Sequence, residues 1–482
     1  MKISHTSYVS QDGYVDADEL RTAFALAMSA MYKREVPLYG NLMRIVRTIN
    51  EEALEKSSNP RITSLKHGDV AAERLDLERH GAIRLGTPYE LKTVRRIFEI
   101  IGMSPVGYYD LSQAGLPMHA TCFRPTTALA LKRNPFRVFT TLLRPDLLKD
   151  VESRDLALDL LEHRNIFSTE LLKLLDASDR QGGRLTQDQG KTFVREAMKT
   201  FGWRPKAAAS KDVYNKLKEE HPILADIASF QGAHINHLTP RTLDIFAAQE
   251  RMKTEGLDVK ERIEGPPPRK CPVLLRQTSF LALEEKIMFV RSDNTFEYGH
   301  HKARFGEIEE RGAAVTPAGR RLYDQLLDEA MKRISQCPEC PDPAEQDRIL
   351  AETFEQYPDD WNVLRAEILV YFNFRVTAKA EGSSMPVRPS REELISCGIL
   401  EAVPITYEDF LPLSAAGIFQ SNLGTGNRGC TSIHNAFADK TGYERALGRT
   451  VIDLDKSYSD AQEVSLRRCA VELGLDEECL IE

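Results

Sequence analysis

Three short stretches of this 482-residue chain contain side chains that could do chemistry together: Arg79–Arg84, His234–Arg241 and Phe305–Arg311. They offer imidazoles, carboxylates and a guanidinium. Two His and one carboxylate on one face of an iron ion leave three coordination positions open. A guanidinium in a fixed position suits a substrate carboxylate. If the fold brings these stretches together, they indicate a non-haem iron site for an acidic small molecule.

The first stretch pairs an imidazole with a guanidinium. Residues His80–Leu85 are predicted to form a strand, because a Gly-Thr-Pro turn follows them. Residues i, i+2 and i+4 of a strand share a face, so His80, Ala82 and Arg84 point the same way. A metal on His80 could hold one end of a substrate while Arg84 pairs with its carboxylate. The alternative is a core His beside an Arg in a surface ion pair.

The second stretch contains two histidines, His234 and His237, three residues apart on a predicted strand over Ala233–Leu238. At this spacing they face opposite sides, so at most one belongs to the site unless the chain bends. The spacing favours His237, because it lies at the strand end, where sites often open. It indicates a structural or supporting role for His234.

The third stretch contains neighbouring carboxylates on a further predicted strand. Glu307 and Glu309 share one strand face, and Glu310 faces away. The apolar residues around them indicate a buried strand, and a buried acid needs a partner such as a metal. A solvated strand edge is the alternative. The spacing leaves the choice between Glu307 and Glu309 open.

The elements that must position these residues repeat one order, strand-helix-strand-strand-strand. The first unit is predicted to contain a strand at 80–85, a helix over 88–101 and strands at 106–111, 118–123 and 136–143. The second unit is predicted to contain a strand at 233–238, a helix from Thr239-Pro240 to near Gly256, and strands at 259–263, 273–280 and 304–314. The two units share a pattern of elements rather than residues.

The chain is therefore predicted to be an α+β protein in which two βαβββ units form a metal-holding sheet. Five segments are expected: an N-terminal helical layer (1–75), the first unit (76–145), a helical insertion (146–228), the second unit (229–315) and a mixed C-terminal region that completes the pocket (316–482). Helical spacing near 320–334 and beyond about 440 supports the last segment.

Composition narrows the classes of partner. The chain is 42% hydrophobic and 28% charged, as in ordinary globular proteins. Its net charge of -8 gives no reason to expect a nucleic acid or an anionic membrane. No apolar run approaches the roughly 20 residues that span a bilayer, and the N-terminus lacks a secretion-signal pattern. The expected location is the cytoplasm.

Other motifs carry less weight. Cys337 and Cys340 form one close pair, but a structural zinc site usually needs a second pair. Residues Gly424–Gly429 match the letters of a dinucleotide-binding fingerprint without the βαβ context that it requires. His300-His301 is interpreted as part of a polar loop.

Longer motifs resemble the 2-oxoadipate dioxygenase/decarboxylase family, whose members are also called 2-hydroxyglutarate synthases. The matching stretches are Arg79–Arg84, Tyr108–Ser112, Asn236–Arg241, Phe305–Glu309 and Thr406–Leu423. The resemblance extends over nearly the whole chain. The family belongs to the vicinal-oxygen-chelate superfamily, whose fold is built from paired βαβββ units, in agreement with the element pattern above.

The resemblance implies roles for particular residues. It makes His80, His237 and Glu307 the ligands of Fe(II), and Arg84 the catalytic residue that binds the substrate. Leu413 and Ser414 match a pair that lines the pocket. The choice of Glu307 is also supported by the similarity of Glu307–Arg311 to the Glu-Ile-Ile-Gln-Arg strand of 4-hydroxyphenylpyruvate dioxygenases, whose first Glu binds iron.

The activity implied is an Fe(II)- and O2-dependent oxidative decarboxylation of the 2-oxo dicarboxylic acid 2-oxoadipate. Hydroxylation of the shortened acid would then give 2-hydroxyglutarate, a step in lysine catabolism. An oxygen-independent isomerase or lyase of the same superfamily, with another divalent metal, is the first alternative. The second is a non-catalytic protein that binds oxo acids, although the chain shows no recognisable output domain.

Overall fold

The computed structural model describes residues 13–56, 74–280, 282–291, 293, 295–302, 304–337, 341–380, 389–411 and 437–481. The chain divides into two compact units. The first contains residues 1–260, 277–310 and 410–451, and the second contains residues 261–276, 311–409 and 452–482. Among the described helices, none has the length and apolar character needed to cross a bilayer. The five-segment division expected from the sequence remains a prediction.

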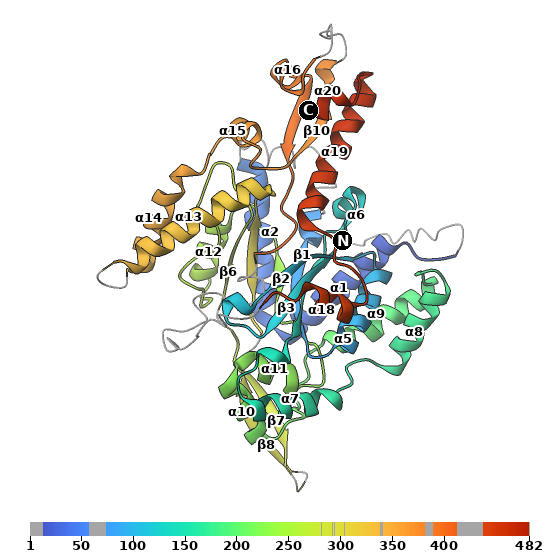
Figure 1. The fold of residues 1–482 in the computed structure, drawn as a ribbon. Helices are drawn as coiled ribbons and strands as arrows, with labels where there is room; N and C mark the ends of the chain where they lie inside the picture. Colours follow the sequence, from blue (N-terminus) through green and yellow to red (C-terminus); the bar gives the residue numbers. More distant parts are fainter. Residues whose placement is uncertain are drawn as a thin grey trace. The chain divides into compact units, whose positions relative to one another are not determined.

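The first unit contains a five-stranded mixed sheet in the order β2-β3-β4-β1-β5. Figure 1 labels three of its strands, β1, β2 and β3. Its strands are β1 (Arg79–Leu85), β2 (Ser104–Asp110), β3 (Met118–Arg124), β4 (Arg137–Leu143) and β5 (Leu238–Pro240). Strand β1 runs parallel to β4 and antiparallel to β5. Helix α5 (Pro88–Ile100) links β1 to β2, and the Thr87 hydroxyl caps it by accepting from Glu90 N. The first predicted βαβββ unit is confirmed.

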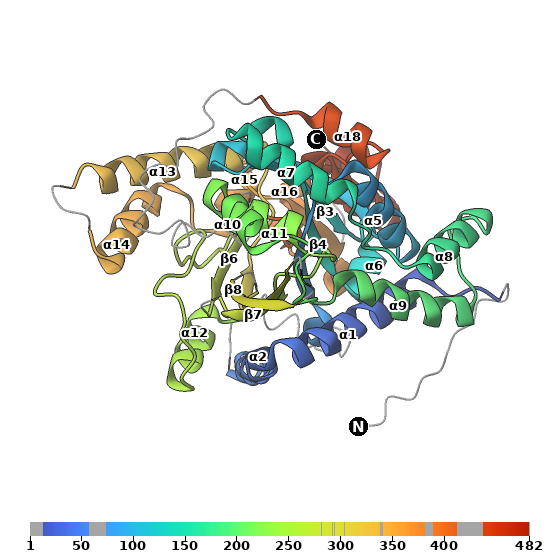
Figure 2. The same ribbon diagram turned by 90° about the horizontal axis from the view of Figure 1, so that it is seen from below.

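A cluster of buried phenylalanines fixes helices to one face of this sheet. Phe123 of β3 contacts Phe98 of α5, and the cluster extends to α1 (Ala17–Glu35) and α9 (Gln187–Phe201). Its ring centroids lie 5.0 to 6.4 Å apart. Figure 2 shows α1 and α9 side by side. Since side chains alternate along a strand, His80 and Arg84 point to the opposite face.

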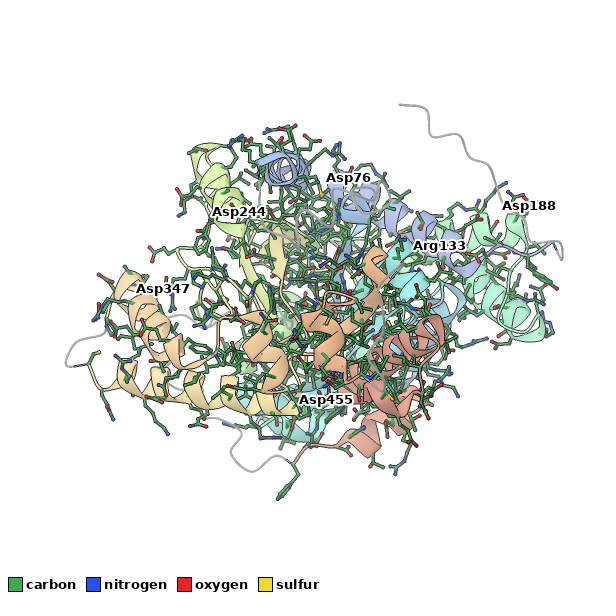
Figure 3. The ribbon with its side chains drawn as sticks, turned by 90° about the horizontal axis from the view of Figure 1, so that it is seen from above. Asp76, Arg133, Asp188, Asp244, Asp347 and Asp455 are labelled. Atoms are coloured by element: carbon green, nitrogen blue, oxygen red, sulfur yellow. The ribbon has the colours of Figure 1, made fainter. Side chains whose placement is uncertain are left out.

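Helices follow β4 where the sequence predicted a helical insertion. They are α7 (Val151–Glu162), α8 (Thr169–Arg180), α9, α10 (Lys211–Glu220) and α11 (Pro222–Ser229). Polar side chains such as Ser168 and Ser210 accept the first free N–H groups of these helices. Asp188 in the first turn of α9 lies at the periphery in Figure 3, and its side chain is 96% exposed. The first unit also contains α2 (Pro37–Lys56), α6 (Ala128–Arg133) and α18 (Lys440–Leu447).

The second predicted βαβββ unit matches the structure only in part. Helix α12 (Ile245–Thr254) begins after the cap Asp244, not at Thr239-Pro240, which lie in β5. The Thr239 hydroxyl donates to Glu307, so it does not cap a helix. The predicted strand over 259–263 is absent, and Val259 makes only a single bridge to Phe280. These element assignments from the sequence were wrong.

An unpredicted hairpin lies inside this part of the chain. Strand β6 (Leu275–Ser279) pairs with β9 (Glu307–Arg311), and β7 (Glu285–Val290) pairs with β8 (Phe296–His301) between them. The interpretation of His300-His301 as a loop was wrong, because both lie in β8. Most residues of β8 are exposed or partly exposed. Glycine, which is depleted in strands, interrupts β8 at Gly299, just before His300-His301.

The second unit combines helices with a small sheet. Strands β10 (Phe372–Val376) and β11 (Leu400–Pro404) are antiparallel, and α19 (Leu454–Leu473) packs on β10. The other helices are α13 (Pro317–Ser335), α14 (Pro343–Thr353), α15 (Trp361–Ala366), α16 (Arg391–Ser396) and α20 (Glu478–Ile481). Leu413, Ser414, Cys340 and the Gly424–Gly429 motif lie outside the described residues.

Candidate metal centre

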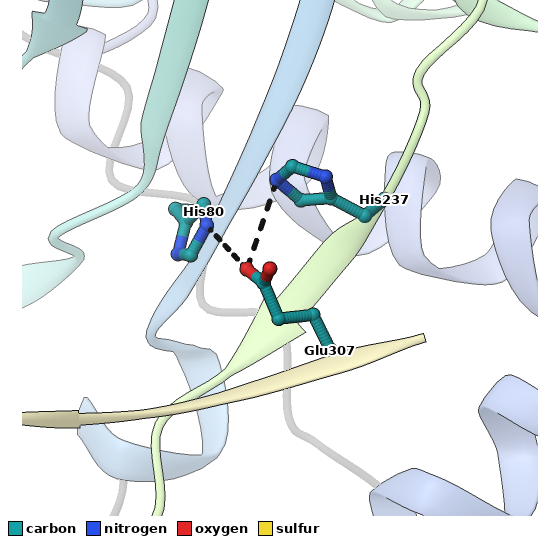
Figure 4. Close-up of side chains that lie close together, drawn as sticks. All are labelled: His80, His237 and Glu307. Carbon is teal, nitrogen blue, oxygen red and sulfur yellow. Dashed lines mark ion pairs between the residues drawn. The ribbon is translucent and has the colours of Figure 1, made fainter. Parts of the chain in front are cut away.

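His80, His237 and Glu307 converge in the first unit (Figure 4). Glu307 Oε1 lies 3.1 Å from His80 Nε2 and 3.8 Å from His237 Nε2. The three side chains are at most 1% exposed. One ligand atom from each residue lies within 4.8 Å of the others. The fold therefore brings together three residues that are widely separated in the sequence.

The backbone of three adjacent segments produces this convergence. His80 of β1 stands opposite Thr239 of β5 in the antiparallel register. Past the end of β5, Thr242 N donates to Glu309 O of β9 at 2.7 Å. The buried Tyr32 hydroxyl lies 3.0 Å from the carbonyl of Asn236 and 2.7 Å from that of Phe305. These contacts fix the segments that carry His237 and Glu307.

Glu307 and Glu309 occupy different places around His80. Glu307 Oε1 faces the cluster and accepts from Thr239 Oγ1 at 2.9 Å and from Gln277 Nε2 at 2.8 Å. Glu309 Oε2 lies 3.0 Å from His80 Nδ1, the ring nitrogen away from Glu307. Residues behind a ligand in this way orient it and tune its basicity. The geometry thus gives the two carboxylates, which spacing could not separate, distinct positions.

The polar atoms of the cluster fit a divalent metal. The ring nitrogens of His80 and His237 and Glu307 Oε2 are buried without a hydrogen-bond partner among the described residues. A buried polar atom without a partner costs about 1–3 kcal/mol. Two imidazoles and a carboxylate suit several first-row divalent metals. A bound cation would satisfy one ring nitrogen of each histidine together with the Glu307 carboxylate.

Protonation in the cluster favours metal binding at two of the three residues. Burial lowers the pKa of His237 to about 4, so its imidazole is neutral at pH 7. Burial alone would raise the pKa of Glu307, but His237 and His80 hold it below its usual value. For His80, burial disfavours protonation, yet Glu309 and Glu307 together raise its pKa. A metal would replace the proton that these carboxylates attract to His80.

Aromatic rings enclose the cluster. The fully buried Phe410 ring lies 4.8 Å from the His80 ring and 5.3 Å from Phe139. Phe305 lies 5.0 Å from His237 on another side. Apolar walls of this kind lower the local dielectric and restrict water around a metal. They favour chemistry that water would otherwise intercept.

Arg84 belongs to a second buried cluster in the same unit. Its NH1 lies 2.5 Å from Asp226 Oδ2, and the Arg84 side chain is 11% exposed. Asp226 Oδ1 lies 2.9 Å from His301 Nε2 and 3.2 Å from His234 Nε2. The alternative of a surface ion pair for Arg84 is therefore wrong. We call Asp226, His234, His301 and Arg84 the Asp226 cluster.

His234 lies in the Asp226 cluster rather than beside His80, as predicted. The argument for that prediction, that His234 and His237 face opposite sides of one strand, was wrong. Residues 233–237 are not in a strand, and both imidazoles are buried. Sequence reasoning missed Asp226 and His301. The signal for Asp226 was a single acid within the apolar stretch Pro222–Ser229, since a buried acid needs a partner.

Comparisons with known proteins agree over nearly the full length. The family model described as 2-oxoadipate dioxygenase/decarboxylase matches residues 24–422. A relative with that name from Escherichia coli (strain K12) is 46% identical over 95% of this chain and 99% of its own length. One from Pseudomonas putida is 44% identical over 96% of this chain and 98% of its own length.

Solved structures show the same fold. The hydroxyglutarate synthase from Pseudomonas putida has a TM-score of 0.83 at 40% identity, covering 96% of this chain and 100% of its own. The same enzyme in complex with 2-oxoadipate has a TM-score of 0.86 at 42% identity, with the same coverage.

Proposed function

The chain belongs to the 2-oxoadipate dioxygenase/decarboxylase family, and we propose that it converts 2-oxoadipate and O2 into 2-hydroxyglutarate and CO2. The observation that carries the proposal is the buried convergence of His80, His237 and Glu307, in which the four ring nitrogens and Glu307 Oε2 lack hydrogen-bond partners among the described residues. A related hydroxyglutarate synthase has been solved with 2-oxoadipate bound.

The proposed metal is Fe(II), held by His80, His237 and Glu307. When bound, Fe(II) would hold the 2-oxo acid end of the substrate and activate O2 at the positions that the protein leaves open. Two neutral imidazoles and one carboxylate would give this site a net charge of +1, from +2 for the metal and -1 for Glu307. A dianionic substrate is attracted to such a site.

Arg84 would hold the second carboxylate of the substrate. His80 and Arg84 share one face of β1 and are four residues apart, or about 13 Å along the strand. The long arginine side chain and the four-carbon body of 2-oxoadipate can together bridge that distance. By family resemblance, Leu413 and Ser414, which lie outside the described residues, are also proposed to contact the substrate. Binding at both ends fixes which carbons of the substrate face the reactive centre.

The atoms balance without a further co-substrate. Carbon 1 leaves as CO2, carbon 2 becomes the new carboxylate with one oxygen atom from O2, and the adjacent carbon takes the other atom as a hydroxyl group. The substrate supplies both electron pairs that reduce O2. The protein contributes orientation at Arg84 and a dry enclosure from Phe410, Phe139 and Phe305.

The test is an assay of purified chain loaded anaerobically with Fe(II) and then supplied with O2 and a panel of 2-oxo acids. With 2-oxoadipate we expect one O2 consumed and one CO2 released for each 2-hydroxyglutarate formed. Turnover of 2-oxoadipate in the absence of O2 would instead identify an isomerase or lyase. Thermal stabilisation by the oxo acid without turnover, with any divalent metal, would identify a binding protein.

A further inference from the structure

The Asp226 cluster contains a chain of hydrogen bonds that runs from Tyr214 to Arg84. The Tyr214 hydroxyl of α10 bonds to His301 Nδ1 of β8 at 2.9 Å. His301 Nε2 in turn donates to Asp226 Oδ1 at 2.9 Å, and Arg84 NH1 donates to Asp226 Oδ2 at 2.5 Å. The Trp203 ring stacks on His301 with an interplanar angle of 6°. Both oxygens of Asp226 are therefore held by fixed donors.

The same residue types could in principle form a second metal site, since Asp226, His234 and His301 also lie within coordinating distance of one another. Two observations argue against it. The guanidinium of Arg84 lies against Asp226, and it would repel a cation placed there. His301 uses both ring nitrogens in hydrogen bonds to the protein, which leaves no lone pair for a metal.

We propose that Asp226 is a positioning residue that fixes the guanidinium of Arg84 for the second carboxylate of the substrate. This inference rests on the proposed function and deepens it. An arginine side chain has many rotamers, and a substrate carboxylate that must first order it binds more weakly. A charged hydrogen bond to an immobile carboxylate removes that disorder before the substrate arrives.

The helix that carries Asp226 is itself anchored. Arg164 donates to the carbonyls of Ile227 and Phe230 at the end of α11, the latter at 3.2 Å. Its other nitrogens form a buried ion pair with Glu90 of α5, with N···O distances of 2.7 Å. The helical segment between β4 and β5 in the chain thereby holds a rigid carboxylate beside Arg84. This contact gives the segment a role in substrate recognition.

Asp226 could also have the opposite effect on substrate binding. Its negative charge could compete with the substrate for Arg84, in which case removing it would strengthen substrate binding. A guanidinium carries five N–H donors and can bind two carboxylates at once; Arg84 NH1 is bonded to Asp226. Orientation is therefore expected to outweigh competition, and the two effects shift KM in opposite directions.

The experiment compares Asp226→Asn, which removes the charge at constant size, with Asp226→Glu, which keeps the charge one methylene further out. We expect Asp226→Asn to raise KM for 2-oxoadipate about 10- to 100-fold with a much smaller change in kcat, and Asp226→Glu to restore part of the loss. With 2-oxohexanoate, which has a methyl group in place of the second carboxylate, KM should change little. A purely structural role would affect both substrates alike.

Glu196→Gln is the matched control, because Glu196 is a nearly buried acid of the same helical segment that pairs with Lys199. It should leave the preference for 2-oxoadipate over 2-oxohexanoate unchanged. If Asp226→Asn does not fold, the test uses Asp226→Glu. Calorimetry of its anaerobic Fe(II) form then measures the affinity for 2-oxoadipate. An unchanged preference in the Asp226 variants, or a lower KM, would overturn the proposal.

Metal analysis separates the remaining outcomes. Iron should stay at one ion per chain in Asp226→Asn, and loss of a second ion would show that the cluster is a metal site, which would overturn the positioning role. If the wild-type Fe(II) protein does not turn over 2-oxoadipate, the proposed function fails by itself. Anaerobic calorimetry of wild type and Asp226→Asn with 2-oxoadipate would then still confirm or refute the effect of Asp226 on binding.

Discussion

Two buried clusters of the first unit contain two histidines and one carboxylate each, but their polar atoms differ in what they contact. In the cluster of His80, His237 and Glu307, four ring nitrogens and one carboxylate oxygen have no hydrogen-bond partner among the described residues. In the Asp226 cluster, His301 and Asp226 are bonded to the protein, and one ring nitrogen, His234 Nδ1, is without a described partner.

Residue type alone therefore does not identify a metal site. Buried polar groups in folded proteins are almost always satisfied, so a set of unsatisfied donors indicates a ligand that is still to be bound. A satisfied set with a guanidinium against its carboxylate indicates a network that positions side chains rather than a metal site. Burial would raise the pKa of Asp226, yet His234 and Arg84 hold it well below its usual value. Its negative charge is already balanced by the protein.

Alanine substitutions of His237 and His234, which lie three residues apart but in different clusters, should differ most. His237→Ala should abolish stoichiometric iron binding and lower turnover by more than about 100-fold, since even supporting residues behind a ligand contribute 10- to 100-fold. His234→Ala should keep a measurable fraction of both. Iron content by elemental analysis and turnover by O2 uptake check the pair. A full iron complement in His237→Ala would contradict the ligand assignment.

The next effect concerns Arg84, the residue proposed to bind the second carboxylate of the substrate. Arg84→Ala should leave iron bound while KM for 2-oxoadipate rises by about 100-fold, because a charged, partly buried partner of the substrate carboxylate is lost. Arg84→Lys keeps the charge but not the planar fork, so its KM should fall between the two. Steady-state kinetics with iron analysis measure both. Loss of iron from Arg84→Ala would show that the two clusters are not separable.

A smaller effect distinguishes the two carboxylates of β9. Glu309→Gln should weaken iron binding about 10-fold while the protein stays folded, because Glu309 supports the far nitrogen of His80 without facing the cluster. Glu310→Gln, on the other face of the strand, is the matched control and should bind iron as wild type does. Competition with a chelator measures the affinities. If Glu309→Gln lost iron as completely as Glu307→Gln, Glu309 would be a ligand.

The smallest effect concerns the pH dependence of stability. Burial is the main cause of the lowered pKa of His234, so the folded state resists its protonation. Stability linked to this group is therefore lost as pH falls below about 6.5, the unfolded value. His234→Gln should lose less unfolding free energy than wild type between pH 7.5 and 5.5, by at most about 1 kcal/mol.

Urea unfolding of the metal-free proteins at several pH values measures this difference. His300→Gln, which removes an exposed histidine of β8, serves as the control and should follow the wild-type slope. Identical slopes for His234→Gln and wild type would show that His234 is free to protonate in the folded protein.

The first βαβββ unit could be predicted because its signals are local. A Thr-Pro helix start, apolar strands and short turns fix β1 to β4 and α5 without help from distant residues. The second unit could be predicted less well. Thr239 caps no helix because its hydroxyl is bonded to Glu307, and in β8 a glycine precedes the paired histidines His300-His301. The first feature depends on a contact between residues 68 positions apart in the chain.

The sequence by itself determined the fold class, the candidate residues and, through resemblance, the family. It placed His80 and Arg84 on one strand face, because alternation along a strand is a property of the backbone. Resemblance favoured Glu307 over Glu309, but only the tertiary structure showed where each carboxylate lies around His80 and brought Asp226 and His301 to Arg84. Spacing along the chain fixes which residues share a face, whereas packing decides which atoms meet and which are left unsatisfied.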